Sequence, residues 1–249
     1  MKSSREELRK RGYATKEDET LLSDRIDQDV VAALHSKESV IRTIAASKMN
    51  PSEERQVTEL LVQLTQEKSL YTKIAICETL EKGDATTANL MIPYLGVIGG
   101  NQYTKLPEAP SKKKSYPLPR DIIARSLGRM EVGILPTLME AVQGKSTGVE
   151  RAKGIEEFTR IRREGIDAIG FSLFYHPQAV DEEIESTLLE ILNDYMEDSI
   201  TTWKMMTCLS AFPSERSQKV LQESAIREDI IGLEARRSLE MIRKRNITT

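Results

Sequence analysis

The segment Gly144-Lys145-Ser146-Thr147 has the residue types of a phosphate-binding loop, in which backbone N–H groups and a lysine hold nucleotide phosphates. A Walker A motif also needs a glycine five residues before its last glycine, and that position here is Met139. A phosphate loop follows a strand, whereas this segment follows apolar residues at helical spacing. We therefore interpret it as a polar turn between helices.

Metal binding and nucleophilic catalysis need His, Cys or carboxylates in close groups. The two histidines, His35 and His176, are far apart, and neither has a cysteine or carboxylate at ligand spacing. The chain has no Gly-x-Ser-x-Gly segment that would mark a hydrolase nucleophile. Cys77 and Cys208 lie within apolar helical patterns, which is typical of buried free thiols. We expect no metal site, no cofactor and no catalytic residue.

A set of basic residues recurs along the chain at similar places in an apolar pattern: Arg42, Lys73, Arg120, Arg151 and Lys204. At 100° per residue each would lie on the apolar face of its helix, with its stem along the next helical pair and its charged end near a carboxylate or carbonyl. We expect these residues to stabilise the packing rather than to bind a ligand.

The composition excludes several classes of protein. The chain has 249 residues, 39% of them hydrophobic, and a net charge of −3 from 36 basic and 39 acidic residues. This balance is typical of a globular protein and lacks the positive field of a general nucleic-acid binder. No run approaches the roughly 20 apolar residues of a membrane span. The charged N-terminus is not followed by the apolar stretch of a secretory signal, so we expect a cytoplasmic protein.

Apolar residues recur at three- and four-residue spacing along almost the whole chain, and the alternating pattern of strands is nearly absent. Residues 15–34, 52–67 and 214–228 each show one apolar helical face, and Pro51 and Pro213 stand where a helix begins. The pattern predicts an all-α protein.

The helical pattern also repeats. Ile41-Arg42, Ala45-Ala46 and Met49 form a repeated frame. With its first residue counted as position zero, the frame is apolar at position zero, basic at position one, small or apolar at positions four and five, and large at position eight. Later copies begin at Thr72, Pro119, Glu150, Trp203 and Leu233, so the steps are 31, 47, 31, 53 and 30 residues. A recurring period of this size predicts helical hairpins stacked side by side.

The frame, matched best by residues 41–49 and 119–128, resembles the inner helix of HEAT repeats, and its short period is similar to the HEAT-like repeats of phycobilisome lyases. The resemblance implies a right-handed α-α superhelix of about six hairpins, an armadillo-like α-solenoid. HEAT-like inner helices usually carry Asp three residues before the apolar-Arg pair, and Glu38, Ser69 and Tyr116 stand there in three copies.

The repeats set the expected domain organisation. Residues 1–16 form an N-terminal extension, and residues 17–249 form one HEAT-like domain with a loop insertion at 99–118. Residues 150–203 contain a segment broken by Gly165 and Gly170 and a helix at 178–196, which amount to one irregular repeat or to more than one.

The side of each repeated helix opposite its apolar stripe would line the concave face, the usual binding surface of repeat proteins. We expect a partner there at Asp121, Arg125, Arg129, Glu156, Arg160 and Arg163, with Lys112, Lys113 and Lys114 of the insertion at the edge. The alternative is a solvated face with an Arg125–Glu156 pair. Met205, Met206 and Leu209 make another helix apolar all round, so we expect residues 165–175, a second chain or a ligand to cover it.

Together these features predict a non-enzymatic scaffold that binds a protein or peptide. HEAT-like folds include glycosylases that repair alkylated DNA, so a nucleic-acid-binding relative is one alternative; the acidic balance and the single Trp203 at a core position argue against it. A bilin-lyase-like protein is the other alternative, supported only by the repeat frame.

Overall fold

The computed structural model describes residues 4–145, 154–196 and 198–248. Within these ranges the chain forms fourteen α-helices, four short 3₁₀ helices and no strand, which confirms the all-α prediction. The α-helices are α1 (Arg5–Lys10), α2 (Lys16–Gln28), α3 (Val30–Leu34), α4 (Ser39–Lys48), α5 (Glu54–Gln66), α6 (Leu70–Leu80), α7 (Ala85–Met91), α8 (Ile122–Leu127), α9 (Leu135–Gln143), α10 (Ile155–Tyr175), α11 (Glu182–Asp194), α12 (Ser199–Cys208), α13 (Glu215–Ser224) and α14 (Ile230–Thr248). The 3₁₀ helices are η1 (Ile92–Tyr94), η2 (Val132–Ile134), η3 (Pro177–Ala179) and η4 (Leu209–Ala211).

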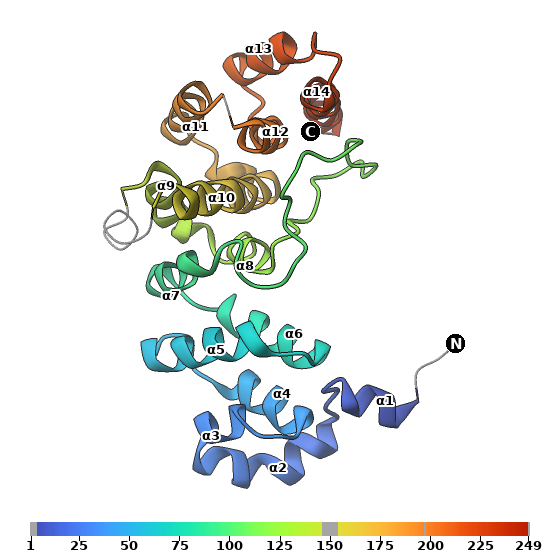
Figure 1. Cartoon of the computed structure of the whole chain (residues 1–249), viewed down its shortest axis with the longest axis vertical. Helices are drawn as coiled ribbons and strands as arrows, with labels where there is room; N and C mark the ends of the chain where they lie inside the picture. Colours follow the sequence, from blue (N-terminus) through green and yellow to red (C-terminus); the bar gives the residue numbers. More distant parts are fainter. Residues whose placement is uncertain (1–3, 146–153, 197, 249) are drawn as a thin grey trace.

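Most helices pack in two rows along the long axis of the molecule (Figure 1). Row A consists of α4, α6, α8, α10, α12 and α14, and each of these helices packs against the next. Row B consists of α3, α5, α7 and α9, which also pack in chain order, followed by α11 against α12 and α13 against α14. The chain therefore alternates between the two rows from α3 to α14.

Short polar side chains start several of these helices. Asp84, Asp121, Asp181 and Asp198 each accept a hydrogen bond from a backbone N–H in the first turn of α7, α8, α11 and α12. Between the caps, apolar side chains at helical spacing form one stripe per helix, and the stripes of the two rows meet in one continuous core. On α5 this stripe is Val57, Leu60, Leu61 and Leu64.

The expected N-terminal extension is packed rather than separate, because residues 4–14 run against α4 and α6. The backbone N–H of Tyr71 donates to the carbonyl of Arg11 at 3.0 Å. Gly12 has a φ of +88°, and a Cβ there would lie 2.8 Å from the hydroxyl oxygens of Thr43 and Thr72. A glycine is therefore required at position 12, where the N-terminal segment passes over α4 and α6.

The segment predicted as a loop insertion, residues 99–118, contains no helix and runs along the side of row A from the level of α8 to α14 (Figure 1). Tyr116 is its buried anchor, 2% exposed. The guanidinium of Arg237 on α14 donates to the carbonyl oxygens of Lys113 and Ser115 at 3.2 and 2.9 Å. The insertion thus joins the middle of the chain to its last helix.

The predicted break at Gly165 and Gly170 is wrong, since both lie inside the continuous helix α10. These glycines serve close packing instead. A Cβ at Gly165 would lie 2.6 Å from Val142, and one at Gly170 would lie 2.0 Å from the hydroxyl of Tyr116. Between residues 155 and 203 the chain forms the row A helix α10, the row B helix α11 and the start of α12.

Arg42 has the structural role expected of the recurring basic residues. Its guanidinium makes two hydrogen bonds to the buried Glu67, at 2.8 and 2.9 Å, and a third to the carbonyl of Ser36. Burial alone would raise the pKa of Glu67, but hydrogen bonds from Arg42, Ser69 and Gln63 outweigh it and lower that pKa from 4.5 to about 2. The pair ties the end of α5 to α4.

We expect Glu67→Gln to lower the free energy of unfolding at neutral pH by about 2–4 kcal/mol, because it leaves the Arg42 charge without its buried partner. The folded-state pKa is depressed, so the contribution of Glu67 is present above pH 4.5 and is lost as the pH falls towards about 2. Urea unfolding between neutral and acid pH measures both effects. Glu54→Gln, at an exposed position of α5, is the control; a pH-independent difference for Glu67→Gln would contradict the assignment.

Candidate functional site

The side of row A that faces away from row B is the candidate site, and we call it the row A face. On α4 and α6 it is formed by the residues five and nine positions after the N-cap, which are Thr43 and Ser47, then Ile74 and Glu78. Ile74 is 41% exposed although it is apolar. The N-terminal half of this face is therefore partly open to solvent.

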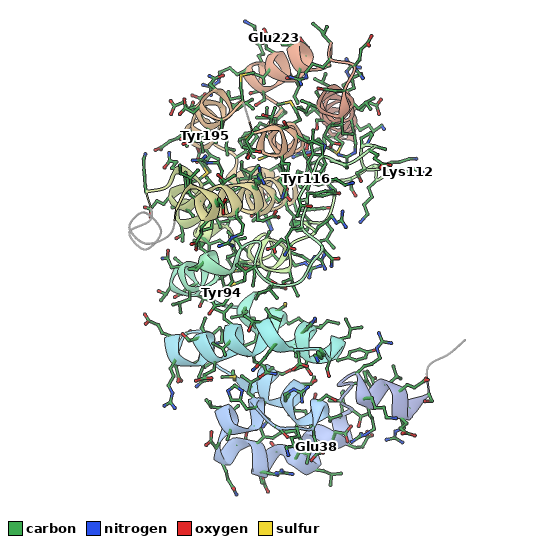
Figure 2. All side chains as sticks on the ribbon, viewed as in Figure 1. Glu38, Tyr94, Lys112, Tyr116, Tyr195 and Glu223 are labelled. Carbon is green, nitrogen blue, oxygen red and sulfur yellow. The ribbon has the colours of Figure 1, made fainter. Side chains whose placement is uncertain are left out.

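The insertion covers the C-terminal half of the row A face. The corresponding positions of α12 are Trp203 and Thr207, since Asp198 is its N-cap. The rings of Tyr103 and Trp203 meet edge to face with centroids 4.7 Å apart, and the guanidinium carbon of Arg120 lies 4.5 Å from the Tyr103 centroid. Figure 2 shows Tyr116 within the packed region between α10 and α12.

Two of the predicted partner-binding residues form hydrogen bonds within the protein. Asp121 is fully buried, where it caps α8 and accepts hydrogen bonds from Gly96 and Gln102 at 3.1 and 2.8 Å. Its predicted place on an exposed face is wrong, because a carboxylate that caps a covered helix cannot face solvent. Arg163 makes two hydrogen bonds to Asp198, at 2.8 and 2.6 Å, and so holds α10 to the start of α12.

The other three predicted arginines contact neighbouring parts of the chain and keep some exposure. Arg125 donates to the carbonyl of Pro119 at 3.1 and 3.0 Å rather than to Glu156. Arg129 is 46% exposed and lies 3.6 Å from Glu81. Arg160 donates to the carbonyl of Pro93 and to Glu157, and partial burial lowers its pKa.

The remaining predicted residues are exposed. Glu156 lines an open hollow of about 590 Å³ beside Tyr94, together with Arg160. Lys112, Lys113 and Lys114 are exposed on the insertion, and Figure 2 shows Lys112 at its outer edge. The structure therefore does not gather the nine predicted residues into one surface. The lysines stand on the insertion, and the arginines are spread over α8 and α10.

Of the three coverings expected for Met205, Met206 and Leu209, the structure shows the first: α10, which contains residues 165–175, packs on α12 and η4. The prediction of self-association through these residues is wrong, since each is at most 1% exposed within the single chain. The frame that begins at Trp203 is two residues out of register. Counted from the cap Asp198, these three side chains occupy the places that Ala45, Ala46 and Met49 fill after Glu38. They are core positions, covered mainly by α10, α11 and α14.

A buried charged cluster lies under the insertion. The ammonium of Lys204, 1% exposed, is 2.8 Å from Glu164 and 2.7 Å from Asp167 on α10. Burial raises the pKa of Glu164 to about 7 and also raises that of Asp167, although Lys204 opposes both shifts. Burial would lower the pKa of Lys204, but the two carboxylates outweigh it and raise it. One cation thus pairs with two carboxylates, the buried Glu164 and the partly exposed Asp167.

A cavity of about 220 Å³ lies between the insertion and α10, α12 and α14. Its walls include Tyr103, Asp167, Trp203, Thr207 and Glu234. The hydroxyl of Thr207 donates to Glu234 at 2.9 Å, so α12 and α14 are joined at this point. Trp203 is buried, as its predicted core position implies, but the sequence frame does not predict that the insertion forms the opposite wall of this cavity.

Other chemistry finds little support among the described residues. No group of three or more His, Cys, Asp or Glu side chains there could hold a metal ion. Burial raises the pKa of the Cys77 thiol to about 11 and raises that of Cys208 further, so both thiols stay protonated. Gly144 ends helix α9 with a φ of +78°, as a turn glycine does; Ser146, Thr147, Glu150 and Arg151 lie outside the described residues.

Among the helices in the described ranges, none is both long and apolar enough to span a bilayer. Comparison with protein-family models, with curated protein sequences and with solved structures gives no match to this chain. Its class therefore rests on the structure itself, which is an all-α protein with two rows of helices and an insertion laid over one face.

Proposed function

We propose that this chain is a non-enzymatic binding scaffold of the HEAT-like class, a right-handed α-α superhelix of about six hairpins. The alternation of the chain between two rows supports this architecture, as do the repeated cap-to-core distances in α4, α6 and α12. In this arrangement residues 17–249 form one domain, and the row A face is its concave side. Repeat proteins of this kind bind partners on that side.

The observation that carries the proposal is the basic character of the insertion. Residues 99–118 contain four lysines and a single carboxylate, Glu108, in a chain of net charge −3. Lys112, Lys113 and Lys114 are exposed, and within the described ranges none of their ammonium groups lies in an ion pair. Three adjacent unpaired ammonium groups raise the local potential, which attracts a negatively charged partner.

The partner in this proposal is an acidic segment of another protein. Its carboxylates would lie against the three lysines, and its apolar side chains would contact the open N-terminal half of the row A face near Ile74. Leu70, 42% exposed and one turn before Ile74 on α6, extends this apolar surface. A mixed surface of this kind fits a polypeptide, because charge sets the register and apolar contact adds affinity.

Selection of displayed random peptides against the purified protein tests the proposal. We expect enriched peptides to be rich in Asp and Glu and to combine these with apolar residues. Replacing Lys112, Lys113 and Lys114 together by Glu should weaken their binding by at least about tenfold, because each lost charge contact removes about 0.5 kcal/mol or more.

The matched control replaces Lys16, Lys37 and Lys219 by Glu, which changes the net charge equally at exposed sites away from the insertion. Equal loss of binding in both variants would contradict the proposal, since only the overall charge would then matter. A nucleic-acid ligand, recognised by binding that falls steeply with salt, would favour the alternative class instead.

A further inference from the structure

The cavity under the insertion has the dimensions of a small-metabolite site. Its volume of about 220 Å³ equals roughly seven water molecules. This is below the 300–1,000 Å³ typical of sites for drug-sized ligands. A nucleotide or a tetrapyrrole is too large for it, and an amino acid is of the right size.

The two walls of the cavity differ in charge. The helical wall is lined by two carboxylates, Asp167 and Glu234, and the cations that pair with them, Lys204 and Arg237, do not line the cavity. The opposite wall comes from the insertion and from the residues just after it, and it supplies two cations, Lys113 and Arg120. A ligand that fits this polarity carries an ammonium at one end and a carboxylate at the other.

Two buried polar atoms of lining residues also lack a partner. Glu234 is 1% exposed and Trp203 is 8% exposed, yet neither the Glu234 Oε2 nor the Trp203 Nε1 has a hydrogen-bond partner. Buried polar groups in native structures are almost always paired, and leaving one unpaired costs about as much as a lost hydrogen bond. The Thr207–Glu234 hydrogen bond places Glu234 beside the turn of α12 that contains Trp203 and Thr207.

We propose that this cavity binds one free α-amino acid. Its ammonium group donates to Glu234 and faces Asp167, and its carboxylate accepts from the indole N–H of Trp203 and faces Lys113 and Arg120. The Tyr103 and Trp203 rings enclose its side chain. Burial raises the pKa of Asp167, and an ammonium group beside it would stabilise the ionised carboxylate. The inference does not depend on the proposed peptide partner.

Thermal unfolding of the full chain with each of the common L-amino acids tests the inference, because a ligand that binds only the folded state raises the Tm. We expect at least one amino acid at saturation to raise the Tm by about 3 °C or more. Its decarboxylated amine and its deaminated acid should each raise the Tm far less, since each fills only one end of the site. Titration calorimetry then gives the Kd of the best amino acid.

Glu234→Gln and Trp203→Phe should each weaken that binding by at least about tenfold, because the first removes a carboxylate while preserving its shape and the second removes the indole N–H while keeping an aromatic ring. Glu223→Gln, at an exposed position of α13, is the control and should leave the Kd unchanged. Far-ultraviolet circular dichroism establishes that each variant is folded. The inference is overturned if no amino acid raises the Tm, if the amine or the acid alone acts equally well, or if both cavity variants bind as tightly as the wild type.

Discussion

Lys204→Met is expected to lower the free energy of unfolding by about 3–5 kcal/mol, one of the two largest effects of a single substitution in this chain. The substitution removes the cation that lies 2.8 and 2.7 Å from Glu164 and Asp167, and it leaves the buried Glu164 and the partly exposed Asp167 without their partner. Methionine fills nearly the same volume, so the loss reports charge rather than packing. Urea unfolding at neutral pH measures it.

A compensating variant separates the charge effect from other causes. Adding Glu164→Gln and Asp167→Asn to Lys204→Met removes the charge of the whole cluster and should recover most of the lost stability. Lys219→Met, at an exposed position of α13, should change stability by no more than about 0.5 kcal/mol. A triple variant as unstable as Lys204→Met alone would contradict the charge explanation.

Gly170→Ala is expected to expel the insertion from row A and to cost about 3 kcal/mol. A Cβ at this position would lie 2.0 Å from the Tyr116 hydroxyl and 3.0 Å from the Cα of Cys208, so neither neighbour leaves room for it. Trp203 is the only tryptophan of the chain and packs against Tyr103 of the insertion. Its fluorescence should therefore shift to longer wavelength when the insertion leaves.

Tyr116→Phe provides the matched rescue, because it removes the oxygen atom that the new methyl group would meet first. The double variant should recover part of the lost stability, and part only, since the ring carbon beneath that oxygen would still be 2.9 Å away. Gly133→Ala, where a Cβ meets no atom within 4 Å, should be harmless. If Gly170→Ala keeps the wild-type emission and stability, the insertion is not fixed by this contact.

The helices could be predicted from the sequence because their signals are local. Apolar residues at helical spacing suffice to place α5, α11 and α13 to within a few residues, and Asp181 and Ser214 cap the last two. The insertion could also be predicted from the sequence, since its Gly, Pro and Lys residues exclude a regular helix. The break at Gly165 and Gly170 could not be recognised as false, because close packing by glycine depends on Val142 and Tyr116, which are distant in the sequence.

The register of the repeats could have been predicted better. The repeat frame follows apolar-basic pairs such as Trp203-Lys204, whereas the N-cap residues recur at the spacing of the helices in the structure. Asp198 caps α12, and Asp229 accepts hydrogen bonds from two backbone N–H groups at the start of α14, as Glu38 and Ser69 stand before α4 and α6. Alignment on these caps moves Met205 into the core and Trp203 onto the row A face.

The candidate site was only partly predictable, because it depends on how the insertion folds back. The three exposed lysines followed from the sequence, and so did the structural role of Arg42 and Lys204. That the insertion would cover Trp203, and would bring Lys113 and Arg120 opposite Glu234, depends on contacts between residues about 120 positions apart, such as Arg237 with Ser115. No local pattern encodes such a contact.

Site-specific photo-crosslinking in the native host tests whether the insertion on the row A face binds a polypeptide partner. A photoreactive amino acid replaces Lys113 on the insertion in one version of the protein and Lys219 on the opposite row in another. We expect a discrete adduct with an acidic polypeptide from position 113 and none from position 219. The same adducts from both positions, or nucleic acid in place of a polypeptide at position 113, would contradict it.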